Sequence, residues 1–169
     1  MRCWRSQSIM ENFVLYNPVR ILFGKGQTAN IDGQLPKDAR VLVTYGGGSI
    51  LRNGVLNEVR TALGTRHVVL FGGIEPNPHY ETLIKALPVI EREGINFLLA
   101  VGGGSVIDGT KFIAAAACFP GEDKWDLIRH REEHPVQAAL PLGTVLTISA
   151  TGSEMNSAAV VSKAETQEK

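Results

Sequence analysis

One stretch decides the fold, and it reads Asn96-Phe97-Leu98-Leu99-Ala100-Val101-Gly102-Gly103-Gly104-Ser105-Val106-Ile107-Asp108-Gly109-Thr110-Lys111. Residues 96–101 form a mainly apolar run, which suits a β-strand that is buried on both faces. Three glycines and a serine stop this run, and residues 106–118 then read as an Ala-rich helix. A strand, a glycine turn and a helix in this order are typical of an α/β domain with a parallel sheet.

The same alternation of strands and helices extends to both sides of that stretch. Further elements are predicted by apolar spacing: strands over residues 40–45, 67–71 and 140–148, helices over 27–34, 50–63 and 80–92, an edge strand over 13–23 and a hairpin strand over 158–162. Residues 120–137 are polar and charged, and they are expected to form a surface segment. The sequence therefore predicts an α/β fold with a parallel sheet and a β-hairpin near the C-terminus.

Composition limits the classes of partner. The chain has 169 residues, which suits one domain, and 44% of them are apolar. Its 17 basic residues balance its 17 acidic ones, so the charge expected of a nucleic-acid binder or a polybasic membrane anchor is missing. No apolar run approaches the roughly 20 residues that a membrane helix needs. We therefore expect neither nucleic acid nor membrane as a partner.

The N-terminus and the cysteines indicate a cytoplasmic protein. The two cysteines, Cys3 and Cys118, are far apart and form no CxxC pair, which favours a reduced protein. Residues 1–9 lack the apolar core of a signal peptide, and Met10 reads like a natural start. We expect residues 1–9 to be a non-native or disordered extension, and residues 10–169 to be a dinucleotide-binding domain.

The glycine run 102–104 is predicted to bind a phosphate. Glycines let a ligand approach the backbone closely, and the next helix offers free N–H groups and the positive end of its dipole. Ser105 can add a hydroxyl donor. The spacing matches neither G-x-G-x-x-G nor a P-loop, and Gly24-Lys25-Gly26 also lacks the other P-loop positions. The alternative is a tight turn that binds no ligand. If the turn binds a pyrophosphate, we expect a Rossmann-like, nucleotide-binding domain.

A second run, Gly46-Gly47-Gly48-Ser49, follows the strand at residues 40–45. In NAD-preferring folds a carboxylate near this position bonds the 2′-hydroxyl of the ribose. No Asp or Glu lies within residues 41–51, and Arg52 follows, so the run leaves room for a 2′-phosphate. This pattern favours NADP(H) over NAD(H), with a plain turn as the alternative.

Two other polar segments have opposite interpretations. Residues 147–156 crowd hydroxyls, an amide and a glycine after a strand, and they could line a nicotinamide or a ribose, or be a plain polar loop. His130-Arg131-Glu132-Glu133-His134 matches an H-x-x-E-H zinc pattern. It lies in a charged stretch with little apolar face, however, and Pro135 follows it. We interpret this segment as solvated surface.

Four motifs in order resemble the iron-containing (group III) alcohol dehydrogenases, over essentially residues 10–169. They are Tyr16-Asn17-Pro18 with Arg20–Gly26, Gly72–Pro78, Gly102–Lys111, and Ala150–Glu154. The Gly46–Ser49 run is similar to the butanol dehydrogenase branch, which includes NADPH-dependent aldehyde reductases. The resemblance implies an N-terminal domain that binds the cofactor and a C-terminal helical domain whose Asp and three His bind Fe or Zn.

The resemblance also implies roles for individual residues. Gly47, Gly48 and Ser49 would hold the adenosine end, Gly103, Gly104, Ser105 and Asp108 the pyrophosphate and its neighbourhood, Thr147, Thr151, Ser153 and Asn156 the ribose and nicotinamide, and Lys169 would contact the cofactor. The family's metal ligands lie beyond residue 169, so no metal ligand and no catalytic residue is assigned in this chain.

The implied activity is hydride transfer between NADP(H) and small alcohols or aldehydes, with the metal acting as a Lewis acid in the whole enzyme. This chain alone is expected to be inactive, as a fragment or a truncated gene product. A homodimer through the edge strand at 13–23 is expected by the same resemblance. The alternatives are a non-catalytic dinucleotide-binding fragment, a dehydroquinate-synthase-like relative, and an α/β fold without a ligand.

Overall fold

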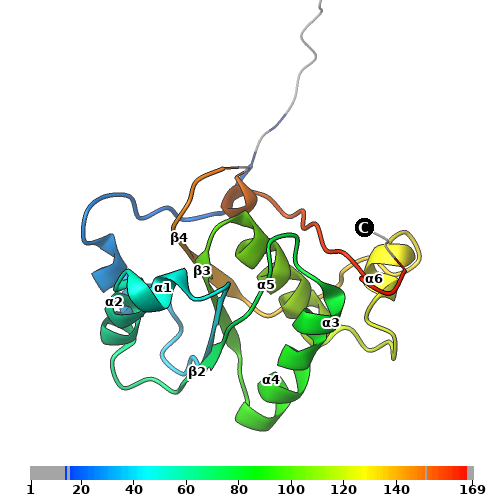
Figure 1. Ribbon diagram of the computed structural model, residues 1–169, viewed down its shortest axis with the longest axis horizontal. Helices are drawn as coiled ribbons and strands as arrows, with labels where there is room; N and C mark the ends of the chain where they lie inside the picture. The colour runs from blue at the N-terminus through cyan, green and yellow to red at the C-terminus, as the bar shows by residue number, and fades with distance from the viewer. Residues whose placement is uncertain (1–13, 15, 151, 167–169) are drawn as a thin grey trace, which may run out of the picture.

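The computed structural model describes residues 14, 16–150 and 152–166; the extension predicted for residues 1–9 lies outside them. Within this described part, four parallel strands form one sheet in the order β2-β1-β3-β4 (Figure 1). The strands are β1 (Val41–Tyr45), β2 (Val68–Phe71), β3 (Phe97–Gly102) and β4 (Leu142–Leu146). The four predicted strands are therefore confirmed, each a residue or more shorter than expected or shifted by one.

The strand order places a topological switch point between β1 and β3. From β1 the chain adds β2 on one side, then crosses back and places β3 on the other side of β1. Thr44 is in register with Ala100, and Gly102 with Leu146, so the carboxyl ends of β1, β3 and β4 meet at one edge. Open α/β sheets bind ligands outside the carboxyl ends of their strands at such a point.

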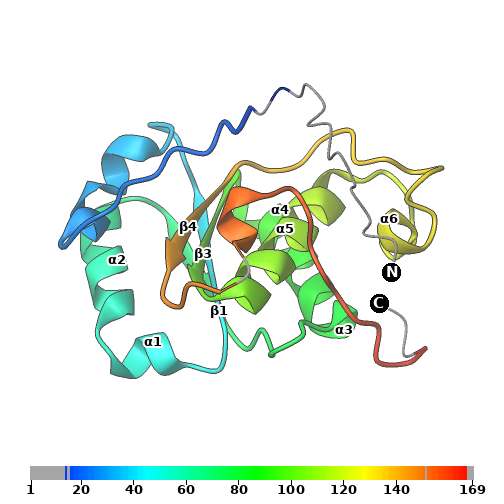
Figure 2. The same cartoon turned by 90° about the horizontal axis from the view of Figure 1, so that it is seen from above.

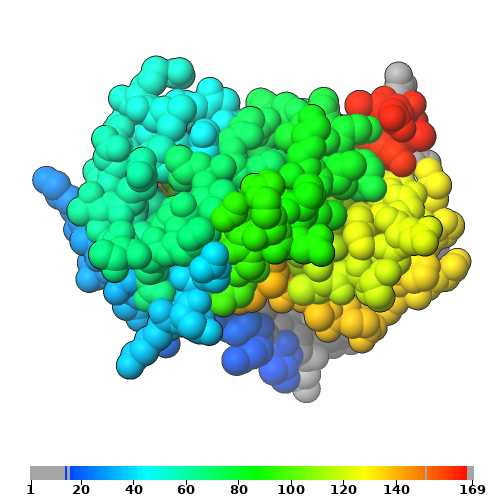
Figure 3. Space-filling model, turned by 90° about the horizontal axis from the view of Figure 1, so that it is seen from below, coloured from blue at the N-terminus to red at the C-terminus, as the bar shows by residue number. Residues whose placement is uncertain are grey.

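Helices cover both faces of the sheet (Figure 2). They are η1 (Gln27–Asn30), η2 (Asp32–Gln34), α1 (Ser49–Arg52), α2 (Val55–Leu63), α3 (Tyr80–Leu83), η3 (Ile84–Ala86), α4 (Leu87–Glu93), α5 (Gly104–Cys118), α6 (Asp126–Arg129) and η4 (Ser153–Met155), where η denotes a 3₁₀ helix. One helical layer contains α2, and the other contains α3, α4 and α5. Figure 3 shows the α2 region (teal), the α3–α4 region (green) and residues near 120–130 (yellow) abutting one another across one face.

Alternate residues of the central strands supply two separate cores. Leu42 and Leu98 pack with α3, α4 and α5, whereas Val43 and Leu99 pack with α2. Because successive strand side chains point to opposite faces, an apolar run without alternation buries both faces. All six residues of β3 are buried, as its sequence predicts.

Two predicted helices are interrupted. The helix expected over 50–63 is divided at Gly54, whose φ is 86°, into α1 and α2, and Leu51 on the expected buried stripe is 54% exposed. The helix expected over 80–92 is divided by the 3₁₀ turn η3, which places Pro88 in the first turn of α4. Proline is tolerated there because its missing N–H would have no intrahelical partner. The helix expected over 27–34 is two 3₁₀ turns, η1 and η2.

Two expectations about peripheral segments are wrong for the residues described. Residues 14 and 16–23 of the expected edge strand, and the expected hairpin strand at 158–162, form no strand in this structure. Instead Ser162 makes an isolated parallel bridge to His79, where Tyr80 N donates to Ser162 O at 2.8 Å. The expected surface segment 120–137 is confirmed, since only Trp125 and Leu127 within it are buried; it also contains α6, and the Trp125 indole packs edge-on against Tyr80 at 5.3 Å.

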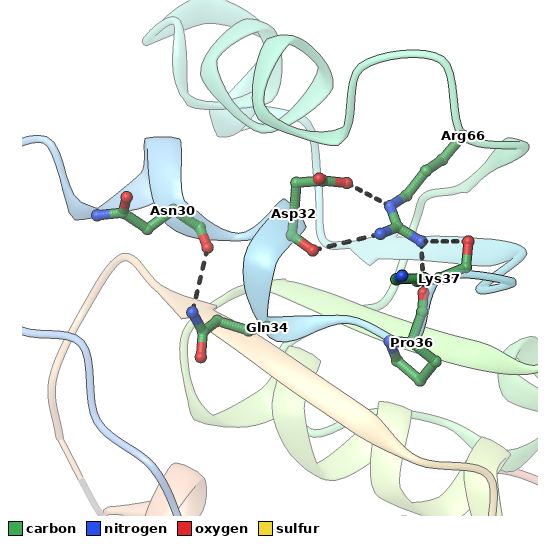
Figure 4. A network of polar contacts seen from close by, with 6 residues as sticks. All are labelled: Asn30, Asp32, Gln34, Pro36, Lys37 and Arg66. Carbon is green, nitrogen blue, oxygen red and sulfur yellow. Dashed lines mark hydrogen bonds and ion pairs between the residues drawn. The ribbon is translucent and has the colours of Figure 1, made fainter.

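Arg66 fastens the amino-end edge of the sheet, opposite the switch point (Figure 4). Its guanidinium bonds the carboxylate of Asp32 (Nε–Oδ1 2.5 Å) and the carbonyl of the same residue (3.3 Å). It also donates to the carbonyls of Pro36 and Lys37, at 2.5 and 3.2 Å. One side chain thus satisfies three carbonyl groups of the connection into β1. Arg66 therefore connects η2 to the turn before β2.

Candidate functional site

Three loops leave the carboxyl-end edge of the sheet: residues 46–48 after β1, residue 103 after β3, and residues 147–150 after β4. Val106, in the first turn of α5, joins the first two loops. A Cβ placed on Gly102 would lie 2.6 Å from Val106 Cγ2, and one on Gly46 would lie 3.5 Å from the same atom. The third loop joins them through Thr147, whose N–H donates to the carbonyl of Gly102 at 3.0 Å. The structure therefore brings together the segments that the sequence analysis singled out separately.

The Gly102–Gly104 turn fits a pyrophosphate. Gly102 must be glycine because any side chain there would collide with Val106. Gly103 precedes α5 in an extended conformation and no side chain caps the helix. The first N–H groups of a helix lack intrahelical partners, and α5, with 15 residues and no acidic residue in its first turn, presents them at the switch point. These features suit an anionic group, which would accept hydrogen bonds from that turn.

Ser105 lies where its hydroxyl can take part in such binding. Its Oγ accepts a hydrogen bond from Asn77 N at 3.4 Å, which leaves the hydroxyl hydrogen to be donated elsewhere. Asn77 has a φ of 54°, within the Pro76-Asn77-Pro78 turn. This turn thus reaches the start of α5 from the connection between β2 and α3.

The Gly46–Ser49 run is partly open to solvent. Gly47 and Ser49 are exposed, whereas Gly48 is buried with a φ of 94°, a conformation that favours glycine. A Cβ on Gly47 would have no heavy atom within 4 Å. The run therefore has free space where a side chain of Gly47 would lie.

The loop after β4 is held both by its own side chains and by bonds from neighbouring elements. Ser153 is buried at the start of η4. Asn156 Oδ1 accepts from Ala158 N at 3.0 Å and its Nδ2 donates to Gly152 O at 3.0 Å. Thr147 is exposed at the end of β4. Two further predicted contacts of the cofactor, Thr151 and Lys169, lie outside the described residues.

Asp108 lies on the second turn of α5 and points to the chain that follows η4. Its Oδ2 accepts from Val160 N at 3.1 Å, while its Oδ1 is buried without a hydrogen-bond partner among the described residues. A buried carboxylate oxygen that lacks a donor is costly, so it has the capacity to accept another bond.

Sequence reasoning missed two features of α5. Thr110 is fully buried; its Oγ1 bonds Val106 O at 2.6 Å and lies 2.6 Å from Thr44 Oγ1 in β1. The hydroxyl at position 44 within an otherwise apolar strand is the signal that could have revealed this pair. Lys111 was missed as well, and its Nζ bonds Asn156 Oδ1 at 3.0 Å and Ala158 O at 2.7 Å.

The described residues hold no group of three or more His, Cys, Asp and Glu side chains that could bind a metal ion. His130 lies 3.9 Å from carboxylate oxygens of both Asp126 and Glu133, and His134 packs against the ring of Phe119. Iron or zinc therefore does not fit the part of the chain that the structure describes. In that same part, no helix has the length and apolarity to cross a membrane.

Known proteins resemble this chain in both sequence and structure. It is 53% identical over 161 residues to the NADPH-dependent aldehyde reductase YqhD of Escherichia coli, and 48% identical over 158 residues to NADP-dependent alcohol dehydrogenase 3 of Entamoeba histolytica. These matches cover 95% and 91% of this chain, and 41% of each relative. The chain thus spans well under half the length of these relatives.

The solved structures agree. The crystal structure of E. coli YqhD superposes with a TM-score of 0.87 and 54% identity, over 92% of this chain and 40% of that one. The NADH-dependent butanol dehydrogenase A of Thermotoga maritima superposes with a TM-score of 0.86 and 41% identity, over 93% of this chain and 40% of that one. The predicted α/β fold with a parallel sheet is therefore confirmed.

A family model identifies the group that these relatives share. The model of the iron-containing alcohol dehydrogenases matches residues 18–169, which is most of the chain. This match agrees with the resemblance inferred from the four motifs. The chain belongs to the iron-containing alcohol dehydrogenase family.

Proposed function

We propose that this chain binds NADP(H) across the carboxyl-end edge of its sheet. The observation that carries the proposal is the Gly102–Gly104 turn, which delivers the uncapped start of a 15-residue helix to the switch point between β1 and β3. The pyrophosphate accepts hydrogen bonds from Gly103, Gly104 and Ser105, beside Asp108.

The two ends of the cofactor extend to either side of the pyrophosphate. Gly47, Gly48 and Ser49 hold the adenosine end. Thr147, Thr151, Ser153 and Asn156 face the ribose and the nicotinamide, and Lys169 contacts the cofactor. The contact of Thr147 with Gly102 supports this arrangement, because it places the third loop directly beside the phosphate turn.

NADP(H) is proposed over NAD(H) because residues 46–49 carry no carboxylate and Gly47 has open space above it. Relatives of both kinds exist, since the E. coli reductase is NADPH-dependent and the T. maritima enzyme is NADH-dependent. Equilibrium dialysis of the chain against NADPH and NADH tests the proposal. We expect tighter binding of NADPH; preference for NADH contradicts the cofactor assignment, and binding of neither contradicts the function.

For the whole enzyme, we propose hydride transfer between NADP(H) and small alcohols or aldehydes. The described residues contribute binding and orientation of the cofactor, while the nicotinamide itself supplies the hydride chemistry. Orientation matters because holding two reactants in the right geometry removes much of the entropic barrier. The chain's own role is therefore that of the dinucleotide-binding domain, over residues 10–169.

The expected behaviour of the 169-residue chain is binding without turnover. The described residues form no metal site, so butanal has no polarising group beside the cofactor. NADPH oxidation with butanal is measured at several concentrations of the pure chain. A steady-state rate that scales with chain concentration contradicts this division of roles.

A homodimer and a cytoplasmic location are part of the same proposal. Tyr16, Ile21 and Phe23 are 83%, 63% and 93% exposed in an extended segment that forms no strand among the residues described. Such a segment can gain its backbone partners from a second copy. Sedimentation equilibrium should give a dimer that dissociates when Ile21 and Phe23 are replaced by Asp. Imaging of a tagged chain in its cell tests the location.

A further inference from the structure

Two charged side chains of α5 bind the segment of residues 156–160, which runs from η4 toward α3 (Figure 2). Asp108 Oδ2 accepts from Val160 N at 3.1 Å. One helical turn later, Lys111 Nζ donates to Asn156 Oδ1 at 3.0 Å and to Ala158 O at 2.7 Å. Side chains three residues apart lie on one face of a helix, so both act on the same segment.

The amine of Lys111 reaches this position at an electrostatic cost. Burial lowers the pKa of Lys111, while Asp108 and Glu154 act in the opposite direction. A desolvated amine without partners would be unfavourable, and the two oxygen acceptors on residues 156 and 158 compensate for the lost water. The hydrogen-bonding capacity of the amine is thus used on this segment.

Asn156 connects Lys111 to the loop after β4 by hydrogen bonds. Its Oδ1, which accepts from Lys111, also accepts from Ala158 N, and its Nδ2 donates to Gly152 O at 3.0 Å. Gly152 precedes η4 with a φ of 72°. A continuous path of hydrogen bonds therefore runs from Lys111 through Asn156 to the turn that begins η4.

We infer that Lys111 is a positioning residue, which fixes residues 152–156 for the nicotinamide half of the cofactor. The inference rests on the proposed binding of NADP(H). The inference follows because α5 contacts the binding sites for both halves of the cofactor. Its first turn faces the pyrophosphate, and Lys111, two turns further along the helix, bonds the loop after β4, which lies beside the Gly102–Gly104 turn. One rigid helix thus sets the position of the nicotinamide half relative to the phosphates.

The test compares NADPH with 2′,5′-ADP, which has the adenosine half of the cofactor and no nicotinamide. In Lys111→Met, NADPH should bind about tenfold more weakly, because a hydrogen bond to a charged group is lost. Binding of 2′,5′-ADP should change by less than about twofold, since the adenosine subsite is untouched. The fluorescence of bound NADPH, which reports on the nicotinamide, should shift back toward that of the free cofactor.

Matched variants separate positioning from general stability. Lys111→Arg keeps a cation and should recover most of the NADPH affinity, while Lys85→Met removes an exposed lysine on η3 and should change neither ligand. If Lys111→Met folds poorly, Lys111→Gln, whose neutral amide is shorter than the lysine side chain, takes its place in the same comparison of NADPH with 2′,5′-ADP.

The outcomes are distinguishable. Equal losses of NADPH and 2′,5′-ADP in Lys111→Met overturn the positioning role, and so does unchanged binding of both. If the unmodified chain binds neither ligand, the proposed function itself fails. Binding of both by the unmodified chain, with a selective loss of NADPH in the variant, supports the inference.

Discussion

At the scale of single residues, the glycines of the two runs have different physical tasks. Gly102 is required by packing, because a Cβ there would overlap Val106, whereas Gly47 and Gly103 have room for a side chain. A Cβ on Gly103 would meet Ile148 at an ordinary 3.7 Å. Substitutions at the first position therefore report on folding, and those at the other two report on ligand approach.

The pair Gly102→Ala and Gly103→Ala should separate these tasks. Overpacking makes Gly102→Ala less stable by about 2 kcal/mol. Gly103→Ala should unfold like the parent, within about 0.5 kcal/mol, but bind NADPH at least about tenfold more weakly, because its methyl blocks the phosphate. Urea unfolding measures the stability of each variant, and fluorescence titration measures its affinity for NADPH. Tight NADPH binding by Gly103→Ala argues against backbone contact there.

A carboxylate at position 47 should reverse the cofactor preference. Gly47→Asp fits sterically and places a negative charge near the 2′-phosphate, so NADPH affinity should fall about tenfold or more while NADH affinity holds or improves. Gly47→Asn, of similar size and without charge, is the control. Equal losses of NADPH affinity in both variants indicate a steric effect and contradict the proposed 2′-phosphate position.

At the scale of elements, α5 is tied to the sheet by the buried hydroxyls of Thr44 and Thr110. Because Thr110 bonds Val106 O, it leaves Thr44 to donate the proton between the two side chains. Removal of Thr110 leaves the buried Thr44 hydroxyl with only a long bond to Leu99 O at 3.5 Å, whereas removal of both hydroxyls leaves an apolar contact of nearly the same shape.

The valine variants test this account of the threonine pair. Thr110→Val should cost about 2 kcal/mol of unfolding free energy. Thr44→Val/Thr110→Val should cost less than the sum of the two single variants, and Thr110→Ser should retain most of the parent stability. Chemical denaturation gives all four values. Strictly additive single costs would show that the hydroxyls act independently.

The Arg66 network offers a second test at this scale, far from the binding edge (Figure 4). Arg66 is 13% exposed in its side chain and serves three carbonyl groups and a carboxylate. Arg66→Met should lower the unfolding free energy by about 2 kcal/mol and leave NADPH affinity unchanged. Arg92→Met, at a side chain 66% exposed, should cost no more than about 0.5 kcal/mol. A loss of NADPH affinity in Arg66→Met would contradict this expectation, because it would show that the amino-end edge of the sheet influences the binding edge.

The accuracy of the element predictions depended on what stabilises each element. Strands β1 and β3 are predictable because both their faces are buried, and a strand buried on both faces has a continuous apolar sequence. The extended segments at 16–23 and 158–162 bond residues far away in the sequence, so local spacing does not reveal them, and the break at Gly54 follows from its left-handed backbone, which apolar spacing does not record. The glycine loops of the candidate site were predictable because each run of glycines follows directly on a strand in the sequence. Lys111 and Thr44 were not, since their partners lie 45 or more residues away.

At the scale of the whole molecule, the aromatic cluster joins α3, α5 and the segment before α6. Tyr80 contacts Phe112 and Trp125 edge-on, and its hydroxyl donates to Asp123 at 3.1 Å. Burial, together with the hydrogen bond and charge of Asp123, raises the pKa of Tyr80 to about 12. The neutral phenol is thus stabilised in the folded chain relative to the unfolded one.

This shift predicts a dependence of stability on alkaline pH. Because the pKa of Tyr80 is raised on folding, its contribution is complete below about pH 10 and is lost as the pH rises toward 12. The difference in unfolding free energy between the parent and Tyr80→Phe should therefore shrink between these values. Tyr16→Phe, at a residue 83% exposed, should show no such trend. A constant difference for Tyr80→Phe across that interval would contradict the assignment.

The parallel arrangement of the sheet has a consequence for how this domain can change over generations. All four strands point the same way, so residues that secure the fold at one rim, such as Arg66, are a full strand length from those proposed to meet the cofactor. Substitutions at the two rims then have nearly independent effects. Substitutions at residues 46–49 can therefore change the cofactor preference without earlier substitutions that stabilise the fold. Related domains can then differ in their use of NADH or NADPH while they keep the same fold.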